Sequence, residues 1–390
     1  MKKVLGVSIG EIALKGLNRR YFEDQLINQI VRAIKDIGYE NIYKEQGKIY
    51  IVGNDNDYSK MVNRLKKVFG LVRISPCIRI NKNFKGIQKA SIISMEEAID
   101  RDSEIKTFKV DTNRADKSFT MKSPQISRQI GGILLNEFDS LNVDVHEPDI
   151  YLYIDIRRDY AYIYNKKIKA YGGLPVGTNG KGLLLLSGGI DSPAAGFMMA
   201  KRGIDINCVH YHSYPFTSER AEEKVKILAK ILSRYTGRIK FHSINLLEIQ
   251  KEINAKCPER EMTILSRRFM MRIAESIARY NGYNALITGE NLGQVASQTV
   301  ESIGVINDVV SLSILRPLIG MDKIDIIDIA KDIETYETSI LPFEDACTVF
   351  LPKHPVTKPR LRDIQKSEEV LDTNKLVENA VNNMEVYTID

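Results

Sequence analysis

The stretch from Leu183 to Pro193 joins an apolar strand to a glycine turn that carries two serines and an aspartate: Leu-Leu-Leu-Leu-Ser-Gly-Gly-Ile-Asp-Ser-Pro. The leucine run has the length and apolarity of a buried parallel strand, and Ser192 and Pro193 suit the N-cap and the first position of a helix. The backbone N–H groups of Gly188 and Gly189 and the helix dipole both favour an anion, which predicts a phosphate-binding loop. A turn without a ligand would leave the aspartate and both serines unexplained.

A second glycine-rich stretch lies just upstream, where Gly177–Gly182 superficially resembles a Walker loop. The required spacing G-x-x-x-x-G-K-[ST] fails, because Pro175 stands where the first glycine belongs and Gly182 where Ser or Thr belongs. Five glycines fall between Gly172 and Gly182, a composition typical of a domain boundary. We therefore interpret this stretch as a linker.

Polar residues follow two further apolar runs of the same region. His210 and Tyr211 lie at the end of the run Asn207–Tyr211, and Gly289 follows the run Ala285–Thr288. Ligands of a doubly wound sheet bind outside the carboxyl ends of its strands, so these loops and the phosphate loop are expected to form one adenosine pocket. A strand-end histidine that binds no ligand is the alternative interpretation of His210.

Cys347 is the candidate for covalent chemistry. The prolines around it argue against a core position, and Lys353 and His354 would lower the pKa of a nearby thiol and favour the nucleophilic thiolate. The prolines are Pro342, Pro352, Pro355 and Pro359.

The other three cysteines carry no such signals. Cys208 lies in an apolar strand and is expected in the core, while Cys77 and Cys257 are expected to be incidental. Four cysteines without a C-x-x-C pair and only five histidines argue against a zinc or iron–sulfur site. This usage fits a reducing cytosol and predicts a cytoplasmic protein.

Composition and charge narrow the class of protein. With 43% hydrophobic and 27% charged residues, the chain is typical of a globular protein, and it contains neither a secretory signal nor the apolar run of about 18 residues that a membrane span needs. Residues 60–170 hold 21 Lys and Arg against 14 Asp and Glu, although the whole chain has a net charge of only +6. A basic middle domain beside a nucleotide site indicates nucleic acid, with a solvated lysine-rich surface as the alternative.

Apolar periodicity divides the chain into three parts that must position these residues. A helix over residues 18–37 and a strand pair ending at 52 open a small α+β unit. A second unit has helices after 58 and 123 and strands at 74–80, 150–156 and 160–164. From Gly182 onward apolar strands alternate with helices, which predicts a doubly wound parallel sheet. The expected boundaries are 1–58, 59–170, a linker at 171–181, and 182–390.

Six motifs in order resemble the ThiI family of tRNA 4-thiouridine synthases (tRNA sulfurtransferases). The resemblance covers nearly the whole chain and implies N-terminal ferredoxin-like and THUMP RNA-binding domains followed by a PP-loop ATP pyrophosphatase domain. The motifs are Gly10–Gly16, Ser187–Ser192, His210–Ser218, Met262–Arg268, Thr288–Glu290 with Gln294–Thr299, and Phe343–Thr348.

The resemblance also implies a reaction and its site residues. ATP would adenylate O4 of a tRNA uridine (position 8 in this family), and sulfur would then replace the activated oxygen to give 4-thiouridine. Asp191 would help to bind Mg²⁺ with the departing pyrophosphate, and Cys347 would handle the sulfur. Independently of the resemblance, the residue type of Arg267 suits it to binding phosphate, and Arg268 is the alternative for that role. The residues implied to bind ATP are Leu185, Leu186, Ser187, Gly188, Gly189, Asp191, Ser192, His210, Tyr211, Arg267, Gly289 and Gln298.

Many family members carry a C-terminal rhodanese domain with a second catalytic cysteine, and this chain stops at Asp390, too soon to hold one. A cysteine desulfurase is therefore expected to pass persulfide sulfur to Cys347, directly or through a carrier. The thiol that resolves the intermediate is left open, with Cys208 a weak candidate. A homodimer and sulfur supply for thiamine synthesis, as in some family members, are also left open.

Two other function classes compete with this interpretation. A PP-loop enzyme that adenylates a small molecule would need no basic THUMP-like domain. A measurement of whether ATP consumption depends on tRNA distinguishes such an enzyme from a tRNA sulfurtransferase. An RNA-binding protein with a vestigial ATPase half would not need the intact residues Ser187, Gly188, Gly189, Asp191 and Ser192. An ATP–pyrophosphate exchange assay distinguishes such an RNA-binding protein from an active adenylating enzyme.

We predict that Cys347→Ser still consumes ATP in the presence of tRNA but makes no thiouridine from cysteine and a desulfurase, because adenylation needs no thiol. Free sulfide at high concentration should partly bypass the defect, since sulfide is itself a nucleophile. Cys77→Ser and Cys257→Ser serve as controls and should thiolate near the wild-type rate. Normal thiolation by Cys347→Ser from persulfide donors would show that another residue carries the sulfur.

Overall fold

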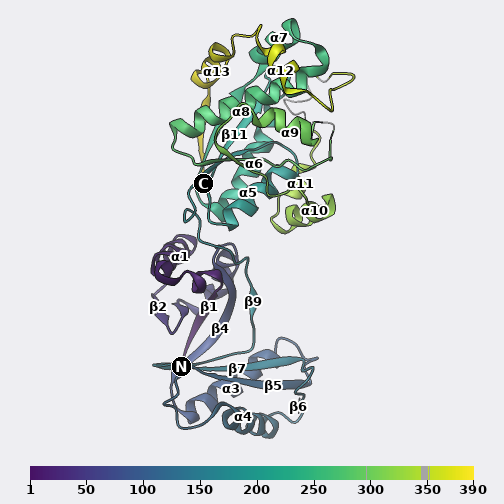
Figure 1. Cartoon of the computed structure of the whole chain (residues 1–390). Coiled ribbons are helices and arrows are strands. Elements are labelled where there is room, and N and C mark those ends of the chain that lie inside the picture. Colours follow the sequence, from purple (N-terminus) through teal and green to yellow (C-terminus); the bar gives the residue numbers. More distant parts are fainter. Residues whose placement is uncertain (296, 344–349, 351) are drawn as a thin grey trace. The chain divides into compact units, whose positions relative to one another are not determined.

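The computed structural model describes residues 1–295, 297–343, 350 and 352–390. The chain forms two compact units, Met1–Pro175 and Val176–Asp390, and each unit contains its own sheet (Figure 1). No helix in the part of the chain that the structure describes combines the length and the apolar character of a membrane span. Cys347 lies outside the described residues.

The first unit is built on one nine-stranded mixed sheet with the strand order β2-β3-β1-β4-β8-β7-β5-β6, and β9 pairs with β4. The long strand β4 belongs to both halves of this sheet, because it pairs with β1 over one part and with β8 over another. The strands are β1 (Lys2–Ile9), β2 (Asn41–Glu45), β3 (Lys48–Val52), β4 (Leu71–Asn81), β5 (Thr107–Arg114), β6 (Asn142–Val143), β7 (Ile150–Ile156), β8 (Tyr160–Tyr164) and β9 (Ile168–Lys169). The helices are α1 (Arg19–Ile34), α2 (Tyr58–Leu65), α3 (Phe84–Ile99) and α4 (Ser123–Glu137).

Two separate apolar cores lie under these helices. Leu26 of α1 packs with Leu5 of β1 in the first core, and Ile130 of α4 packs with Phe108 of β5 in the second. The sequence assigned α2 to the second domain, but Met61 of α2 lies in the first core. The apolar periodicity of a sequence predicts which face of a helix is buried. It does not predict which neighbouring element packs against that face, and the partner of α2 was therefore assigned incorrectly.

The second unit is an α/β fold whose six-stranded sheet has the order β14-β13-β10-β11-β12-β15. Strands β10 to β14 pair in parallel, and β15 pairs antiparallel with β12. The doubly wound parallel sheet predicted from the sequence is therefore confirmed, while β14 and β15 were not predicted. The strands are β10 (Lys181–Leu185), β11 (Asp205–His212), β12 (Ile239–Asn245), β13 (Ala285–Ile287), β14 (Ser313–Leu315) and β15 (Glu385–Ile389).

Helices cover both faces of this sheet. Helix α5 packs against α6 and α10 in one layer, and α8 packs against α7, α9 and α13 in the other (Figure 1). The chain runs from β10 outward to β11 and β12 and then returns to β13 on the other side of β10. This reversal places a crevice at the carboxyl ends of β10 and β13, where open α/β sheets bind ligands. The helices are α5 (Asp191–Lys201), α6 (Glu219–Thr236), α7 (Leu247–Lys256), α8 (Met262–Tyr280), α9 (Val300–Asn307), α10 (Lys323–Asp332), α11 (Tyr336–Ser339), α12 (Leu361–Glu368) and α13 (Thr373–Asn382).

A buried ion-pair network fastens α12 to α8. The guanidinium of Arg268, which is 1% exposed, donates hydrogen bonds of 2.9 and 2.8 Å to the two carboxylate oxygens of Glu368. Arg272 donates to the same two oxygens at 2.8 Å. Burial alone would raise the pKa of Glu368, but the hydrogen bonds from Arg272 and Arg268 outweigh burial and lower it below the ordinary value.

We predict that Glu368→Ala destabilises the protein by about 3 kcal/mol at neutral pH, because it removes the buried carboxylate partner of Arg268 and leaves only Asp308, at 3.4 Å. A lowered folded-state pKa stabilises the fold above the ordinary glutamate pKa of 4.5, and this stabilisation is lost as the pH falls through the folded-state value. Urea titrations at neutral and acid pH should therefore show the gap between wild type and variant closing in acid. A gap of the same size at both pH values would contradict the assignment.

Candidate functional site

The loop between β10 and α5 is closed by hydrogen bonds between Ser187 of the loop and Ser192 in the first turn of α5. The backbone N–H of Ser187 donates to Oγ of Ser192 at 3.0 Å, and the two hydroxyl oxygens lie 3.1 Å apart. The sequence predicted Ser192 as the N-cap of the helix, but α5 begins at Asp191 and its N-cap is Ile190. Since Ile190 has no polar side chain, no cap competes with an anion for the first N–H groups of the helix.

The carboxylate of Asp191 is held from both sides. Its Oδ1 lies 2.5 Å from Nζ of Lys323, the first residue of α10, and its Oδ2 accepts a hydrogen bond of 2.9 Å from Nε2 of Gln294. Neither partner was predicted as a site residue. The signal that could have identified Lys323 is its position in the first turn of a helix. A positive charge there is unfavourable to the helix dipole, and an acidic partner is therefore expected.

A cavity of about 270 Å³ opens at the carboxyl ends of β10, β11 and β13. Every residue predicted to bind ATP lines this cavity except Gly188. The lining residues are Leu185, Leu186, Ser187, Gly189, Asp191, Ser192, His210, Tyr211, Arg267, Met270, Met271, Thr288, Gly289, Glu290, Gln298 and Ile306.

Gly188 lies against a buried lysine instead. A Cβ built on Gly188 would lie 3.3 Å from Nζ of Lys224, a residue of α6 that is 6% exposed. The same ammonium donates a hydrogen bond of 2.8 Å to the carbonyl oxygen of Leu341. The absent side chain of Gly188 thus leaves room for the end of Lys224 behind the phosphate loop.

Gly289 sets the distance between the two loops of the crevice. A Cβ at this position would come within 2.7 Å of the backbone nitrogen of Ser192 and 2.9 Å of the carbonyl carbon of Asp191. Both obstacles are backbone atoms at the start of α5, and they cannot rotate away as the end of a side chain would. Only glycine allows this approach.

His210 is buried and neutral at physiological pH. Burial lowers its pKa to about 4, and its Nδ1 lies 3.1 Å from the carbonyl oxygen of Leu186. Because a carbonyl only accepts, Nδ1 carries the proton and Nε2 is left as an acceptor. An acceptor in this cavity suits an exocyclic amine such as that of adenine. The hydroxyl of the neighbouring Tyr211 donates to the carbonyl of Met270 at 2.5 Å and fixes that ring.

The two neighbouring arginines of α8 face different surroundings. Arg267 lines the cavity, and its Nη1 lies 3.3 Å from Oε1 of Glu290. Arg268 is buried in the network with Glu368, so the alternative assignment of Arg268 to phosphate is wrong. Glu290, which was not predicted, also accepts a hydrogen bond of 2.6 Å from Nε of Arg316 and thereby orients Arg267 at the cavity wall.

The described cysteines lie outside this cavity. Cys208 is fully buried in β11, as expected, and burial raises the pKa of its thiol well above the ordinary value. That environment opposes thiolate chemistry at Cys208. Burial also raises the pKa of Cys77, to about 12, and that of the partly buried Cys257.

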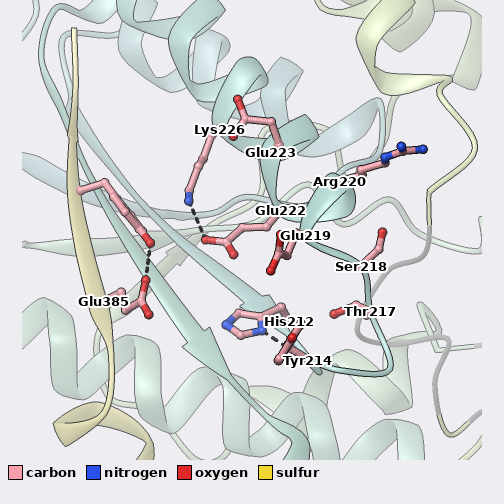
Figure 2. A pocket seen from close by; sticks show the side chains of 11 residues that line it. His212, Tyr214, Thr217, Ser218, Glu219, Arg220, Glu222, Glu223, Lys226 and Glu385 are labelled. Carbon is pink, nitrogen blue, oxygen red and sulfur yellow. Dashed lines mark hydrogen bonds and ion pairs between the residues drawn. The ribbon is translucent and has the colours of Figure 1, made fainter.

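A larger cavity of about 620 Å³ lies between the start of α6 and the end of β11 (Figure 2). Figure 2 shows Lys226 pointing to Glu222, its ion-pair partner at 3.0 Å. The carboxylates outnumber the cations in this cavity, which disfavours a triphosphate or an RNA backbone. Its charged residues are Glu219, Glu222, Glu223, Glu385, Arg220 and Lys226, together with His212.

Comparison with known proteins gives three family matches along the chain. Residues 177–373 match the family described as thiamine biosynthesis protein (ThiI), residues 4–75 the ThiI ferredoxin-like domain, and residues 81–166 the THUMP domain.

Relatives and solved structures extend these matches to the whole chain. The probable tRNA sulfurtransferase of Alkaliphilus metalliredigens is 54% identical, over 100% of this chain and 99% of its own. That of Finegoldia magna is 54% identical over 99% and 98%. The crystal structure of a 4-thiouridine synthetase–RNA complex with bound ATP has a TM-score of 0.94 at 38% identity and covers 100% of both chains. The protein PH1313 from Pyrococcus horikoshii has a TM-score of 0.68 at 25% identity, over 85% of this chain and 99% of its own.

We predict that Gly289→Ala weakens ATP binding at least tenfold, because the new methyl group must push the loop after β13 away from the start of α5. Isothermal titration with a non-hydrolysable ATP analogue measures the effect. Gly304→Ala is the matched control, since a Cβ there meets nothing within 4 Å. Equal affinities of the two variants would refute the role of this close approach.

Proposed function

The chain belongs to the ThiI family, and from this premise we propose that it is an ATP-dependent tRNA sulfurtransferase that converts a uridine to 4-thiouridine. A uracil carbonyl oxygen is a poor leaving group until it is esterified. In the first step O4 attacks the α-phosphorus of ATP, the bond to the bridging oxygen breaks, and pyrophosphate leaves with the electron pair. The uracil N3 proton passes to solvent.

The observation that carries this proposal is the Asp191 carboxylate at the start of α5, beside the phosphate loop and between Lys323 and Gln294. The N–H groups of the loop and of the first helical turn suit the phosphates, and Lys323 adds a positive charge within reach of the departing pyrophosphate. Arg267, oriented by Glu290, suits the α-phosphate.

The adenosine half of ATP fits the rest of the cavity. The unprotonated Nε2 of His210 can accept a hydrogen bond from the adenine amine, and Leu185 and Met270 provide apolar walls for the ring. Because the pKa of His210 is about 4, the pattern of donor and acceptor is constant at neutral pH.

Mg²⁺ fits the same end of the cavity. Among the described residues no group of three or more His, Cys, Asp or Glu could hold a metal ion. Mg²⁺ needs no such group, since one or two carboxylates together with substrate phosphates and water are its usual ligands in nucleotide sites. Asp191 is the residue that would hold it, and the bound ion would neutralise charge on the pyrophosphate.

The sulfur step is proposed for Cys347. The terminal sulfur of a persulfide on Cys347 attacks C4 of the adenylated uracil and AMP leaves, so that C4 is joined to Cys347 through two sulfur atoms. A second thiol then attacks the sulfur of Cys347, the S–S bond breaks, 4-thiouridine leaves as its thiolate, and the two thiols are left joined as a disulfide. A cysteine desulfurase is the expected persulfide donor. The three described cysteines are free thiols, which fits the reducing cytosol where this chemistry would take place.

Unit 1 is proposed to hold the tRNA. This unit, Met1–Pro175, contains the matches to the ferredoxin-like and THUMP domains, and the excess of basic residues lies in its residues 60–170. Shape and phosphate contacts rather than base sequence are expected to determine the affinity, which should fall with salt. Sulfur supply for thiamine synthesis and a homodimer are further proposals for this family member.

We predict that Asp191→Ala and Lys323→Met each lower tRNA-dependent AMP formation by roughly a hundredfold, because each removes a group that stabilises charge on the phosphates. Affinity for tRNA should stay within about threefold of wild type, since unit 1 supplies that binding. Radiolabelled ATP turnover and filter binding give the two values.

Lys331→Met is the control for Lys323→Met, because Lys331 lies on the same helix and its side chain contacts Tyr336 rather than Asp191. Wild-type AMP formation by Lys323→Met would remove Lys323 from the mechanism. The overall function would be wrong if the wild-type protein, given Mg-ATP, sulfide and tRNA, produced no 4-thiouridine by mass analysis.

A further inference from the structure

Helix α6 buries a lysine among its apolar residues. Lys224 is 6% exposed, and the same helix also buries Ala221, Val225 and Leu228. The ammonium of Lys224 donates a hydrogen bond of 2.8 Å to the carbonyl oxygen of Leu341. Because an ammonium is costly to bury, an aliphatic side chain would serve packing better at this position. The contacts of this ammonium therefore need an explanation other than packing.

The carbonyl that Lys224 holds belongs to the chain that leads to Cys347. Leu341 stands six residues before Cys347, and its own side chain is 43% exposed, so that side chain packs only partly against the protein. The Leu341 carbonyl accepts hydrogen bonds from Nζ of Lys224 and, at 2.9 Å, from the N–H of Phe343. We call Leu341–Phe343 the upstream arm, and the buried ammonium of Lys224 anchors it.

The chain that follows Cys347 is anchored as well. Oγ1 of Thr299 lies 2.7 Å from the carbonyl oxygen of Thr357, ten residues after Cys347. Because a carbonyl only accepts, the threonine hydroxyl donates this hydrogen bond. The N–H of Val356 donates a second hydrogen bond, of 3.1 Å, to the carbonyl of Arg260. We call Val356–Thr357 the downstream arm.

Both anchoring side chains adjoin the nucleotide site without lining its cavity. Lys224 lies against the phosphate loop, where a Cβ on Gly188 would come within 3.3 Å of its Nζ. Thr299 directly follows Gln298, which lines the cavity assigned to ATP. Neither Lys224 nor Thr299 is among the residues that line this cavity. The arms before and after Cys347 are therefore tied to the two loops that enclose the nucleotide.

We propose that Lys224 and Thr299 are positioning residues for the sulfur step, because they fasten the chain on both sides of Cys347 to the loops of the nucleotide site. The proposal rests on the function proposed above, in which sulfur on Cys347 attacks a carbon that ATP has activated. Such an attack needs the reacting atoms about 3–3.5 Å apart, and anchored arms raise the fraction of time that a thiol between them spends at that distance. Adenylation needs no thiol, so the anchors matter only when sulfur passes through Cys347.

A direct effect of the Lys224 charge on the phosphates is the competing explanation. A positive charge next to the phosphate loop would attract bound ATP. The two explanations differ in one measurable respect. A phosphate role predicts slower AMP formation whatever the sulfur source, whereas the positioning role predicts a loss confined to sulfur that is delivered through Cys347.

The test measures three rates for Lys224→Met and for Thr299→Val: tRNA-dependent AMP formation, thiolation driven by sulfide, and thiolation driven by cysteine with a desulfurase. Methionine keeps the unbranched stem of lysine and valine keeps the size of threonine, so each substitution mainly removes the hydrogen-bond donor. We expect thiolation with the desulfurase to fall at least fivefold in each variant. AMP formation and sulfide-driven thiolation should stay within twofold of wild type.

Lys230→Met and Thr299→Ser are the matched controls. Lys230 is an exposed residue of the same helix, and serine keeps the hydroxyl that donates to Thr357 and caps α9. Both controls should give wild-type rates in all three assays. Thermal melting identifies any variant that does not fold, and Thr299→Val decides the matter if Lys224→Met is one of these.

Two results would overturn the proposal. Equal losses in all three rates by a folded Lys224→Met would assign its charge to the phosphates instead. Wild-type rates in all three assays would leave the two arms without a role in sulfur delivery. Absence of thiouridine in the wild-type reaction with sulfide would instead refute the proposed function, so the two failures are distinguishable.

Discussion

The candidate site depends on one close approach between two backbones. Gly289, after β13, lies so near the start of α5 that a methyl group would overlap the backbone of Asp191 and Ser192. This contact brings the loop after β13, with Gln294 and Gln298, onto the phosphate loop after β10. Because the chain reverses direction between these two strands, the crevice that ligands need already lies at this point of the sheet.

Electrostatics in the crevice are organised by pairs rather than by single charges. Asp191 is held by Lys323, and Arg267 is held by Glu290, which Arg316 holds in turn. Each pair restrains a long charged side chain before any ligand is present, so less conformational entropy would be lost if that side chain bound a ligand. The neighbouring Arg268 has a structural role instead. Its buried ion pair with Glu368 joins α8 to α12, and its guanidinium is not available to a ligand.

Much of the fold could be predicted from local patterns. The leucine run and glycine turn at residues 183–193 gave β10, the phosphate loop and α5, because a buried parallel strand and a helix start both have strong local signatures. The short strand β14 and the C-terminal strand β15 were missed, since neither has a long apolar run. The packing of α2 in the first core was also missed, because an amphipathic pattern does not identify its partner.

The sequence by itself determined which residue types could meet phosphate and adenine, because glycine turns, strand ends and the Ser-Gly-Gly-x-Asp-Ser spacing are local properties. Only the tertiary structure decided which side chains complete the site. Lys323 and Gln294 are more than 100 residues from Asp191 in the chain, and their contacts exist only because the sheet order places the loops after β13 and β14 beside the first turn of α5. The same long-range order placed Gly188 against Lys224 and turned Arg268 toward Glu368, since packing rather than residue type selects the partner of a charged side chain.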